Sequence, residues 1–207
     1  MDDAVTQNAY LHLGLSYLQL AERNKARMAF EQAAASNADR AVKEKAAYNY
    51  ALSIHETSFS AFGESVTVFE RFLNDFPNSS YAEKISGYLV ETYLNTRSYE
   101  AALNSIQRIS RPGAKILEAK QKILFQLGTQ AFANAAFPQA VQYFDQSLAL
   151  GQYNRQTQAD ASYWRGESYY RLNKMQEAAR DFNEYLRLTQ QKKTEMYALA
   201  HYNLGYT

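Results

Sequence analysis

A repeated unit of 37 to 39 residues runs along the whole chain and constrains its fold more than any other feature. Each unit has one position, here called the anchor, that is usually a small residue inside a segment rich in helix formers. The anchors are Gly14, Ala51, Val90, Gly128, Gly166 and Gly205. A fixed period of this length indicates a stack of similar units, each of which buries its apolar side against its neighbours.

Two further positions follow the anchor and mark a second helix in each unit. Alanine stands twelve residues after the anchor at Ala26, Ala102, Ala140 and Ala178, and a large apolar residue stands sixteen after it at Phe30, Ile106, Phe144 and Phe182. In the second unit, Ser65 and Phe69 take these places two residues late, which predicts an insertion between residues 58 and 64. Small residues let two helices approach closely, and the large side chains fill the volume beside them.

Composition supports helices throughout. The 207 residues include only three prolines and eight glycines, too few for a protein built from many tight β-turns. We therefore expect an all-α protein of about five antiparallel helix hairpins and one extra helix. The expected repeats are residues 7–40, 41–79, 80–115, 116–155 and 156–192, with a partial repeat at 193–207.

The repeat resembles the tetratricopeptide repeat family. The resemblance covers nearly the whole chain, and its pattern in the first unit is Leu13-Gly14, Tyr17, Ala26, Phe30 and Ala33. It implies a single right-handed superhelical solenoid over residues 1–207, whose first helices line a concave side. It also implies a non-catalytic scaffold for protein-protein interaction. The pattern is broken at Val90, Ser147, Arg165 and Tyr185, where we expect local repacking.

The period exceeds the 34 residues usual for that family. With the segment at residues 69–82, it is similar to the long repeats of outer-membrane assembly lipoproteins and of the periplasmic Tol-Pal coordinator. This similarity implies a bacterial cell envelope, periplasmic or outer-membrane-associated, and a cytoplasmic scaffold is the alternative. An unpaired last helix would expose Leu199, Tyr202, Leu204 and Tyr206, so we expect a fragment of a longer array, with any signal sequence outside it.

Side chains of the first helices that face away from the second helices are the candidate binding residues. They are Lys45, Tyr48, Lys84, Lys122, Phe125, Tyr163, Glu167, Tyr170 and Tyr202. Aromatic side chains offer contact area at low entropic cost, and a row of three lysines can meet carboxylates, so we expect a protein or peptide partner. Alternatively, the aromatics pack against the next unit and the lysines are only solvated.

Two other functions stay open. Four of the aromatics, Tyr48, Phe125, Tyr163 and Tyr202, could stack on sugar rings in a glycan-binding module. The array could also be a structural spacer without a ligand. A chaperone-type carboxylate clamp is not expected, because Leu11 and Leu15 occupy its first two positions.

Enzymes, metal sites and nucleic-acid binding are not expected. Lys+Arg is 22 and Asp+Glu is 21, so the net charge of +1 lacks the basic surface of a nucleic-acid binder. The chain has no cysteine, and its three histidines stand at different offsets from their anchors, so no metal or cofactor site is expected. Phosphate-loop and nucleophile-elbow motifs are missing. No stretch approaches the roughly 18 apolar residues of a membrane span.

Overall fold

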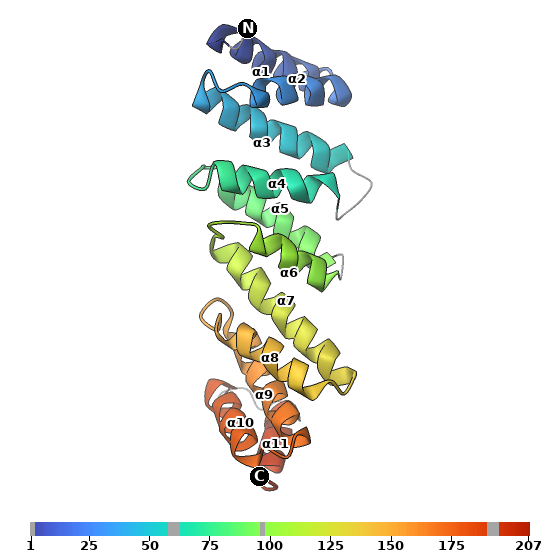
Figure 1. Cartoon of the computed structure of the whole chain (residues 1–207), viewed down its shortest axis with the longest axis vertical. Coiled ribbons are helices and arrows are strands. Elements are labelled where there is room, and N and C mark those ends of the chain that lie inside the picture. Colours follow the sequence, from blue (N-terminus) through green and yellow to red (C-terminus); the bar gives the residue numbers. More distant parts are fainter. Residues whose placement is uncertain (1–2, 58–62, 96–97, 190–194) are drawn as a thin grey trace. The chain divides into compact units, whose positions relative to one another are not determined.

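The structure is a computed structural model that describes residues 3–57, 63–95, 98–189 and 195–207. Its described residues form eleven helices and no strand (Figure 1). The helices are α1 (Ala4–Gln19), α2 (Arg23–Ala35), α3 (Arg40–Thr57), α4 (Glu64–Asp75), α5 (Ala82–Asn95), α6 (Tyr99–Gln107), α7 (Ala114–Ala133), α8 (Phe137–Leu148), α9 (Arg155–Arg171), α10 (Met175–Thr189) and α11 (Glu195–Leu204).

The all-α fold is confirmed, with two helices for each predicted full repeat and one for the partial repeat. Helices α1 and α2, α3 and α4, α7 and α8, and α9 and α10 pack as pairs. The single solenoid and the repeat boundaries stay predictions. The predicted insertion falls mainly on residues 58–62, and the boundary at 192/193 falls within 190–194, so both lie outside the described residues.

The chain divides into two compact units. Unit 1 comprises Met1–Thr96 and Gln107–Gly113, and unit 2 comprises Arg97–Ile106 and Ala114–Thr207. The segment after α6 belongs to unit 1 because polar side chains of α4 hold it. The Arg108 guanidinium donates to both carboxylate oxygens of Glu70 at 2.8 Å, and Asn74 Oδ1 accepts from the Ser110 amide at 2.8 Å.

Close approach at the anchors is confirmed in three repeats, each of which sets a glycine against the phenylalanine sixteen residues later. The pairs are Gly14 with Phe30, Gly128 with Phe144, and Gly166 with Phe182. A Cβ on Gly14 or Gly128 would lie 2.5 Å from a ring carbon, and the distance at Gly166 would be 3.0 Å. All three rings are fully buried, so a side chain at the anchor would displace a phenylalanine ring of the hydrophobic core.

The same three hairpins also share their turn. A residue seven after the anchor adopts a left-handed backbone, with φ of 58° at Ala21, 57° at Ala135 and 59° at Asn173. This conformation lets the chain reverse within a few residues, although alanine tolerates it poorly. The recurrence shows that the turn belongs to the repeat and is independent of the residue that occupies it.

Arg165, one of the departures from the repeat pattern, stands where the first repeat has Leu13, and it forms ion pairs. Its guanidinium donates to Asp181 of α10 at 2.7 and 2.6 Å and to Asp145 of α8 at 2.6 Å. Burial disfavours the charged guanidinium, but the hydrogen bonds to Asp181 and Asp145 outweigh it and raise the pKa of Arg165. The expected local repacking is therefore a three-helix polar contact around α9.

Candidate interaction surface

Helices α7, α9 and α11 of unit 2 carry most of the predicted binding residues. Helices α7 and α9 are in contact, and the Asn203 side-chain amide of α11 donates to the Glu167 carboxylate of α9. Helix α9 is fixed at its start by Asn154, whose Oδ1 accepts from the Thr157 amide at 2.9 Å.

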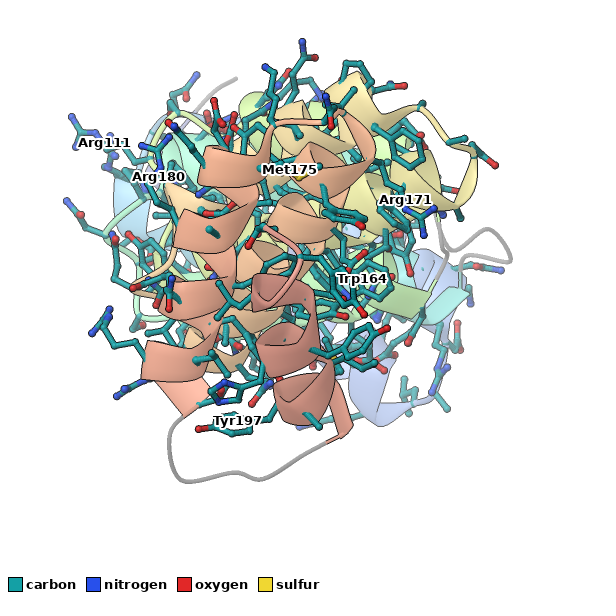
Figure 2. All side chains as sticks on the ribbon, turned by 90° about the horizontal axis from the view of Figure 1, so that it is seen from below. Arg111, Trp164, Arg171, Met175, Arg180 and Tyr197 are labelled. Carbon is teal, nitrogen blue, oxygen red and sulfur yellow. The ribbon has the colours of Figure 1, made fainter. Side chains whose placement is uncertain are left out.

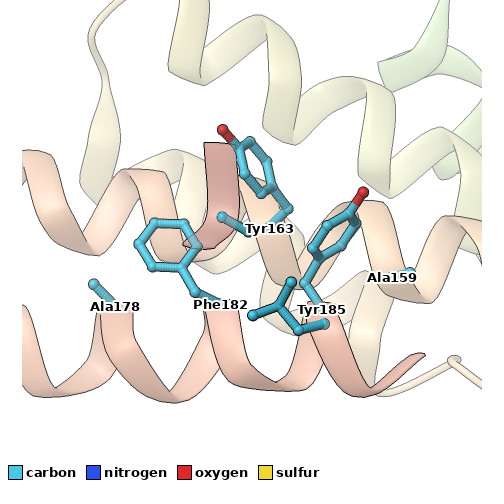
Figure 3. Packing of buried hydrophobic residues seen from close by; sticks show 7 residues of the cluster. Ala159, Tyr163, Ala178, Phe182 and Tyr185 are labelled. Atoms are coloured by element: carbon cyan, nitrogen blue, oxygen red, sulfur yellow. The ribbon is translucent and has the colours of Figure 1, made fainter. Parts of the chain in front are cut away.

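Tyr163 is part of the core and not of the surface. Only 5% of it is exposed, and its ring centre lies 5.7 Å from that of Phe182 and 5.3 Å from that of Tyr185 (Figure 3). Burial, and next the nearby charge of Glu167, raise the pKa of its phenol far above the ordinary range. Tyr163 therefore offers no ring face to a partner, which corrects its assignment as a binding residue.

Tyr48 in unit 1 is buried in the same way, with 8% exposed. Its ring stacks on Tyr81 at 4.1 Å between centres, and Phe72 lies on another side at 6.3 Å. The predicted partner-binding residue Lys84 does come close to it, since the ammonium lies 5.8 Å from the ring centre and hydrogen bonding to Tyr48 raises the pKa of Lys84. Tyr48 thus supports an exposed lysine and does not itself face solvent.

The three candidate lysines are divided between the two units. Lys45 is exposed, and with Lys84 it belongs to unit 1, whereas Lys122 belongs to unit 2. The Lys122 ammonium pairs with Glu118 at 2.7 Å, and that ion pair, followed by a hydrogen bond from Asn154, lowers the pKa of Glu118. Lys122 is therefore already partly neutralised, and the row of three lysines stays a prediction.

Four apolar or aromatic side chains remain open to solvent at the end of unit 2. Tyr170 is 36% exposed, Leu199 43%, Tyr202 61% and Tyr206 60%. The Tyr206 hydroxyl donates to the Tyr202 hydroxyl at 3.0 Å, and the two ring centres lie 4.9 Å apart. That hydrogen bond is the main cause of the raised pKa of Tyr202. These four residues with Glu167 are called the tyrosine face.

The predicted binding residues include Tyr170, Tyr202 and Glu167. They do not include Leu199 and Tyr206, whose exposure on the last helix is predicted from the sequence and confirmed, nor the neighbouring Trp164. Tyr206 stands one residue after its anchor, as Glu167 does, so the repeat alignment contained a signal for it. Among the residues at the same repeat position as Trp164, only Tyr88 is also a Phe, Tyr or Trp. The repeat alignment therefore did not indicate Trp164, and only the tertiary structure places it. Figure 2 labels the half-buried Trp164. Its ring centre lies 5.0 Å from that of Phe132 of α7.

Phe125 lies deeper than expected for a binding residue. It is half-buried, and its ring centre lies 6.0 Å from that of the buried Phe144.

Among the described residues, no group of three or more His, Cys, Asp or Glu side chains could hold a metal ion. No helix in the described ranges is both long and apolar enough to cross a membrane.

Comparison with known proteins agrees with the repeat pattern. The family model for the Tetratricopeptide repeat matches residues 8–39, which span most of α1 and all of α2, and residues 160–188, which span most of α9 and α10. The two matched segments together cover less than half of the chain. Repeat arrays of this kind form extended concave binding surfaces. The two matches agree with the expected non-catalytic scaffold for protein-protein interaction.

Several solved structures of MamA are similar to this chain. MamA AMB-1 is 22% identical, and the alignment covers 95% of this chain and 98% of that one, with a TM-score of 0.40. MamA from Desulfovibrio magneticus RS-1 is 15% identical over 91% of this chain and 98% of that one, with a TM-score of 0.38. No curated protein matches the sequence.

Proposed function

We propose that this chain is a protein-interaction scaffold that binds a peptide or helix of its partner on the tyrosine face. The observation that supports the proposal is the exposure of Tyr170, Leu199, Tyr202 and Tyr206 together, while Tyr163, the repeat equivalent of Tyr202, is buried. Exposed tyrosines near a buried aromatic cluster are typical anchors of protein interfaces, because a two-torsion side chain loses little entropy on binding.

The chemistry of this face favours a partner segment with apolar anchors and one hydrogen-bond donor. The rings and Leu199 offer apolar area, and the half-buried Glu167 carboxylate offers an acceptor beside it. A carboxylate in such a setting prefers a charged or hydroxyl donor, which would share the site with Asn203. We therefore expect an amphipathic segment with a lysine, arginine or serine at its edge.

We place this function in a bacterial cell envelope, either in the periplasm or on the outer membrane. The long repeat period and the segment at residues 69–82 support this placement. Fractionation of the source cells, with detection of the chain by antibody, tests it. Recovery of the chain with cytoplasmic markers alone would refute the placement without affecting the binding proposal.

The binding proposal is tested with Tyr202→Ala and Tyr206→Ala combined. Both side chains are more than half exposed, so helicity by circular dichroism should not change. Capture of partners from extract of the source cells, identified by mass spectrometry, should lose at least one protein in this variant. The matched control is Tyr10→Ala on α1, an exposed tyrosine of unit 1, which should retain that protein. A capture profile identical in all three proteins contradicts the proposal.

Glycan binding is a second candidate, favoured by the two adjoining exposed rings of Tyr202 and Tyr206. Exposed, paired tyrosine rings provide a platform on which a sugar ring can stack. A glycan array probed with the same three proteins separates the two functions. Binding to a glycan that is lost only in the double variant would assign the face to carbohydrate. Failure to capture either a protein or a glycan would favour a structural spacer.

A further inference from the structure

Three adjoining cavities lie on unit 1, beside the second helices α2 and α4. Helix α3 lies between these two helices and contacts both (Figure 1). The first cavity, of about 220 Å³, is lined by all three helices, and α3 contributes Lys43, Ala47 and Tyr50. These three residues are spaced four and three apart, so they form one stripe along α3. The first cavity is therefore a groove along α3, with α2 and α4 as its walls.

The other two cavities continue this groove past the start of α3. The second, of about 270 Å³, shares Lys43, Asp75 and Phe76 with the first. The third, of about 360 Å³, shares Arg40 and Phe76 with the second, and it extends along the segment that follows α4. Because neighbouring cavities share lining residues, the three are one continuous surface, called here the basic groove.

Unit 2 is bridged at the place that corresponds to the first cavity. There the Arg165 guanidinium of α9 donates to Asp145 of α8 and to Asp181 of α10, both at 2.6 Å. A single side chain thus joins the two second helices across the first helix between them.

Unit 1 lacks such a bridge because its residues at the same repeat positions differ. Tyr50 takes the place of Arg165 and bonds Glu31 of α2 at 3.4 Å, but Val68 of α4 has no polar group to complete the bridge. In addition, Ala34 takes the place of Leu148, which packs against the core of unit 2. Small and apolar side chains therefore leave this space open in unit 1.

Two cations at the other end of the groove are held in place by the protein. Arg40 Nη2 donates to the backbone carbonyl of Asp75 at 3.2 Å, and its guanidinium lies 5.6 Å from the ring centre of Phe76. The Lys43 ammonium donates to Asn37 Oδ1 at 2.6 Å. Each hydrogen bond uses one N–H group of its cation, so other N–H groups can reach a ligand.

Cations outnumber carboxylates in both cavities at this end. The second cavity has Arg40 and Lys43 with Asp75, and the third has Arg40 and Arg111 with Glu44. None of these three cations forms an ion pair with a carboxylate of the described residues. The excess positive charge favours an anionic group in the ligand.

We propose that the basic groove binds a short segment of a partner protein, with an apolar side chain in the first cavity and a carboxylate between Arg40 and Lys43. The alanines and Val68 leave room for the apolar side chain, and the two cations match a carboxylate. Ligand sites usually have about 300–1,000 Å³, so each of these smaller cavities suits a single side chain. This site lies in unit 1 and does not depend on the tyrosine face of unit 2.

The probe is a set of short fluorescent peptides in which leucine or phenylalanine is followed closely by an anionic group. In one half of the set this group is an aspartate side chain and the peptide ends in an amide. In the other half asparagine replaces aspartate and the peptide ends in a free carboxylate. Fluorescence anisotropy with the intact chain should show weak but saturable binding of at least one half, which identifies the source of the carboxylate.

Peptides that have asparagine and also end in an amide should bind about tenfold more weakly or less, because the charge-assisted hydrogen bonds are lost. Arg40→Gln combined with Lys43→Gln should weaken binding of the anionic peptides by a similar factor. Ala34→Leu copies Leu148 and should occupy the first cavity. It should therefore abolish the preference for leucine over serine in the peptide, while circular dichroism shows unchanged helicity.

Arg23→Gln combined with Lys25→Gln provides the matched control. Both side chains are exposed on α2 of the same unit, and neither lines one of the three cavities. This variant loses the same charge and should bind the peptides as the unchanged chain does. Tyr202→Ala combined with Tyr206→Ala should also bind them normally, so failure here and failure of the tyrosine face are distinguishable.

The proposal is overturned if no peptide of the set binds saturably. It is also overturned if the Arg40→Gln, Lys43→Gln chain binds as tightly as the unchanged chain. Equal weakening by the Arg23→Gln, Lys25→Gln control would have the same consequence, since attraction would then follow net charge and not the groove. If Ala34→Leu lowers helicity, the comparison of the two charge variants alone decides the result.

Discussion

Single residues in this chain matter most where two helices come within reach of a side chain. Gly128 in α7 faces Phe144 so closely that a Cβ would lie 2.5 Å from a ring carbon. Gly87 in α5 is also helical. Apart from its chain neighbours and the backbone of its own helix, however, no atom lies within 4 Å of the position that a Cβ would take. A glycine is thus needed for close packing in α7 but not in α5, because only the Gly128 Cβ position lies against another side chain.

Gly128→Ala should destabilise the chain by about 1–3 kcal/mol, because the fully buried Phe144 ring must shift from a good rotamer. Gly87→Ala should stabilise it by about 0.5–1 kcal/mol, because alanine removes the entropic cost of a helical glycine. Urea unfolding followed by circular dichroism measures both. Equal shifts in one direction would show that helix propensity alone decides the outcome.

At the scale of helices, the contact of α9 with α10 contains an ion pair, Arg165 with Asp181, at positions that are apolar in the first repeat. Arg165 and Asp181 stand where the first repeat has Leu13 and Ala29. The Asp181 carboxylate is 7% exposed, and burial raises its pKa more than the neighbouring Arg165 lowers it. Removal of one partner of a buried ion pair strongly lowers the free energy of unfolding, whereas replacement of both partners by apolar residues often changes it little.

Arg165→Leu alone should therefore cost about 3–5 kcal/mol, because Asp181 would be left buried without its cation. Combining Arg165→Leu with Asp181→Ala copies the first repeat and should recover most of that loss. Asp145 is half exposed and can be hydrated, so it needs no compensating change. Thermal unfolding of the three proteins gives the comparison, and a double variant as unstable as the single one would contradict it.

At the scale of the whole molecule, each of the two compact units consists of repeats that contact their neighbours in sequence, as in repeat arrays. In unit 1 these contacts join neighbouring helices from α1 to α5, and in unit 2 they join neighbouring helices from α7 to α11. Stability should therefore be local, and no single free energy of unfolding should describe the chain.

This locality can be measured by hydrogen exchange of the Gly128→Ala variant. Exchange should accelerate in peptides from α7, α8 and α9, whereas peptides from α1 and α2 should keep the rates of the unchanged chain. Mass spectrometry of peptic fragments resolves the two regions. The same acceleration in both units would show that the chain unfolds as one cooperative body.

Much of this protein was determined by the sequence alone. The period placed the helices, and the anchors and their phenylalanines identified the contacts within hairpins, because close helix packing leaves room only for certain residue sizes. The tertiary structure decided which aromatic side chains face solvent. Tyr163 and Tyr202 hold the same repeat position, yet one is buried by Phe182 and Tyr185 and the other is exposed. Burial depends on neighbours that are distant in sequence, and a repeat position alone does not specify them.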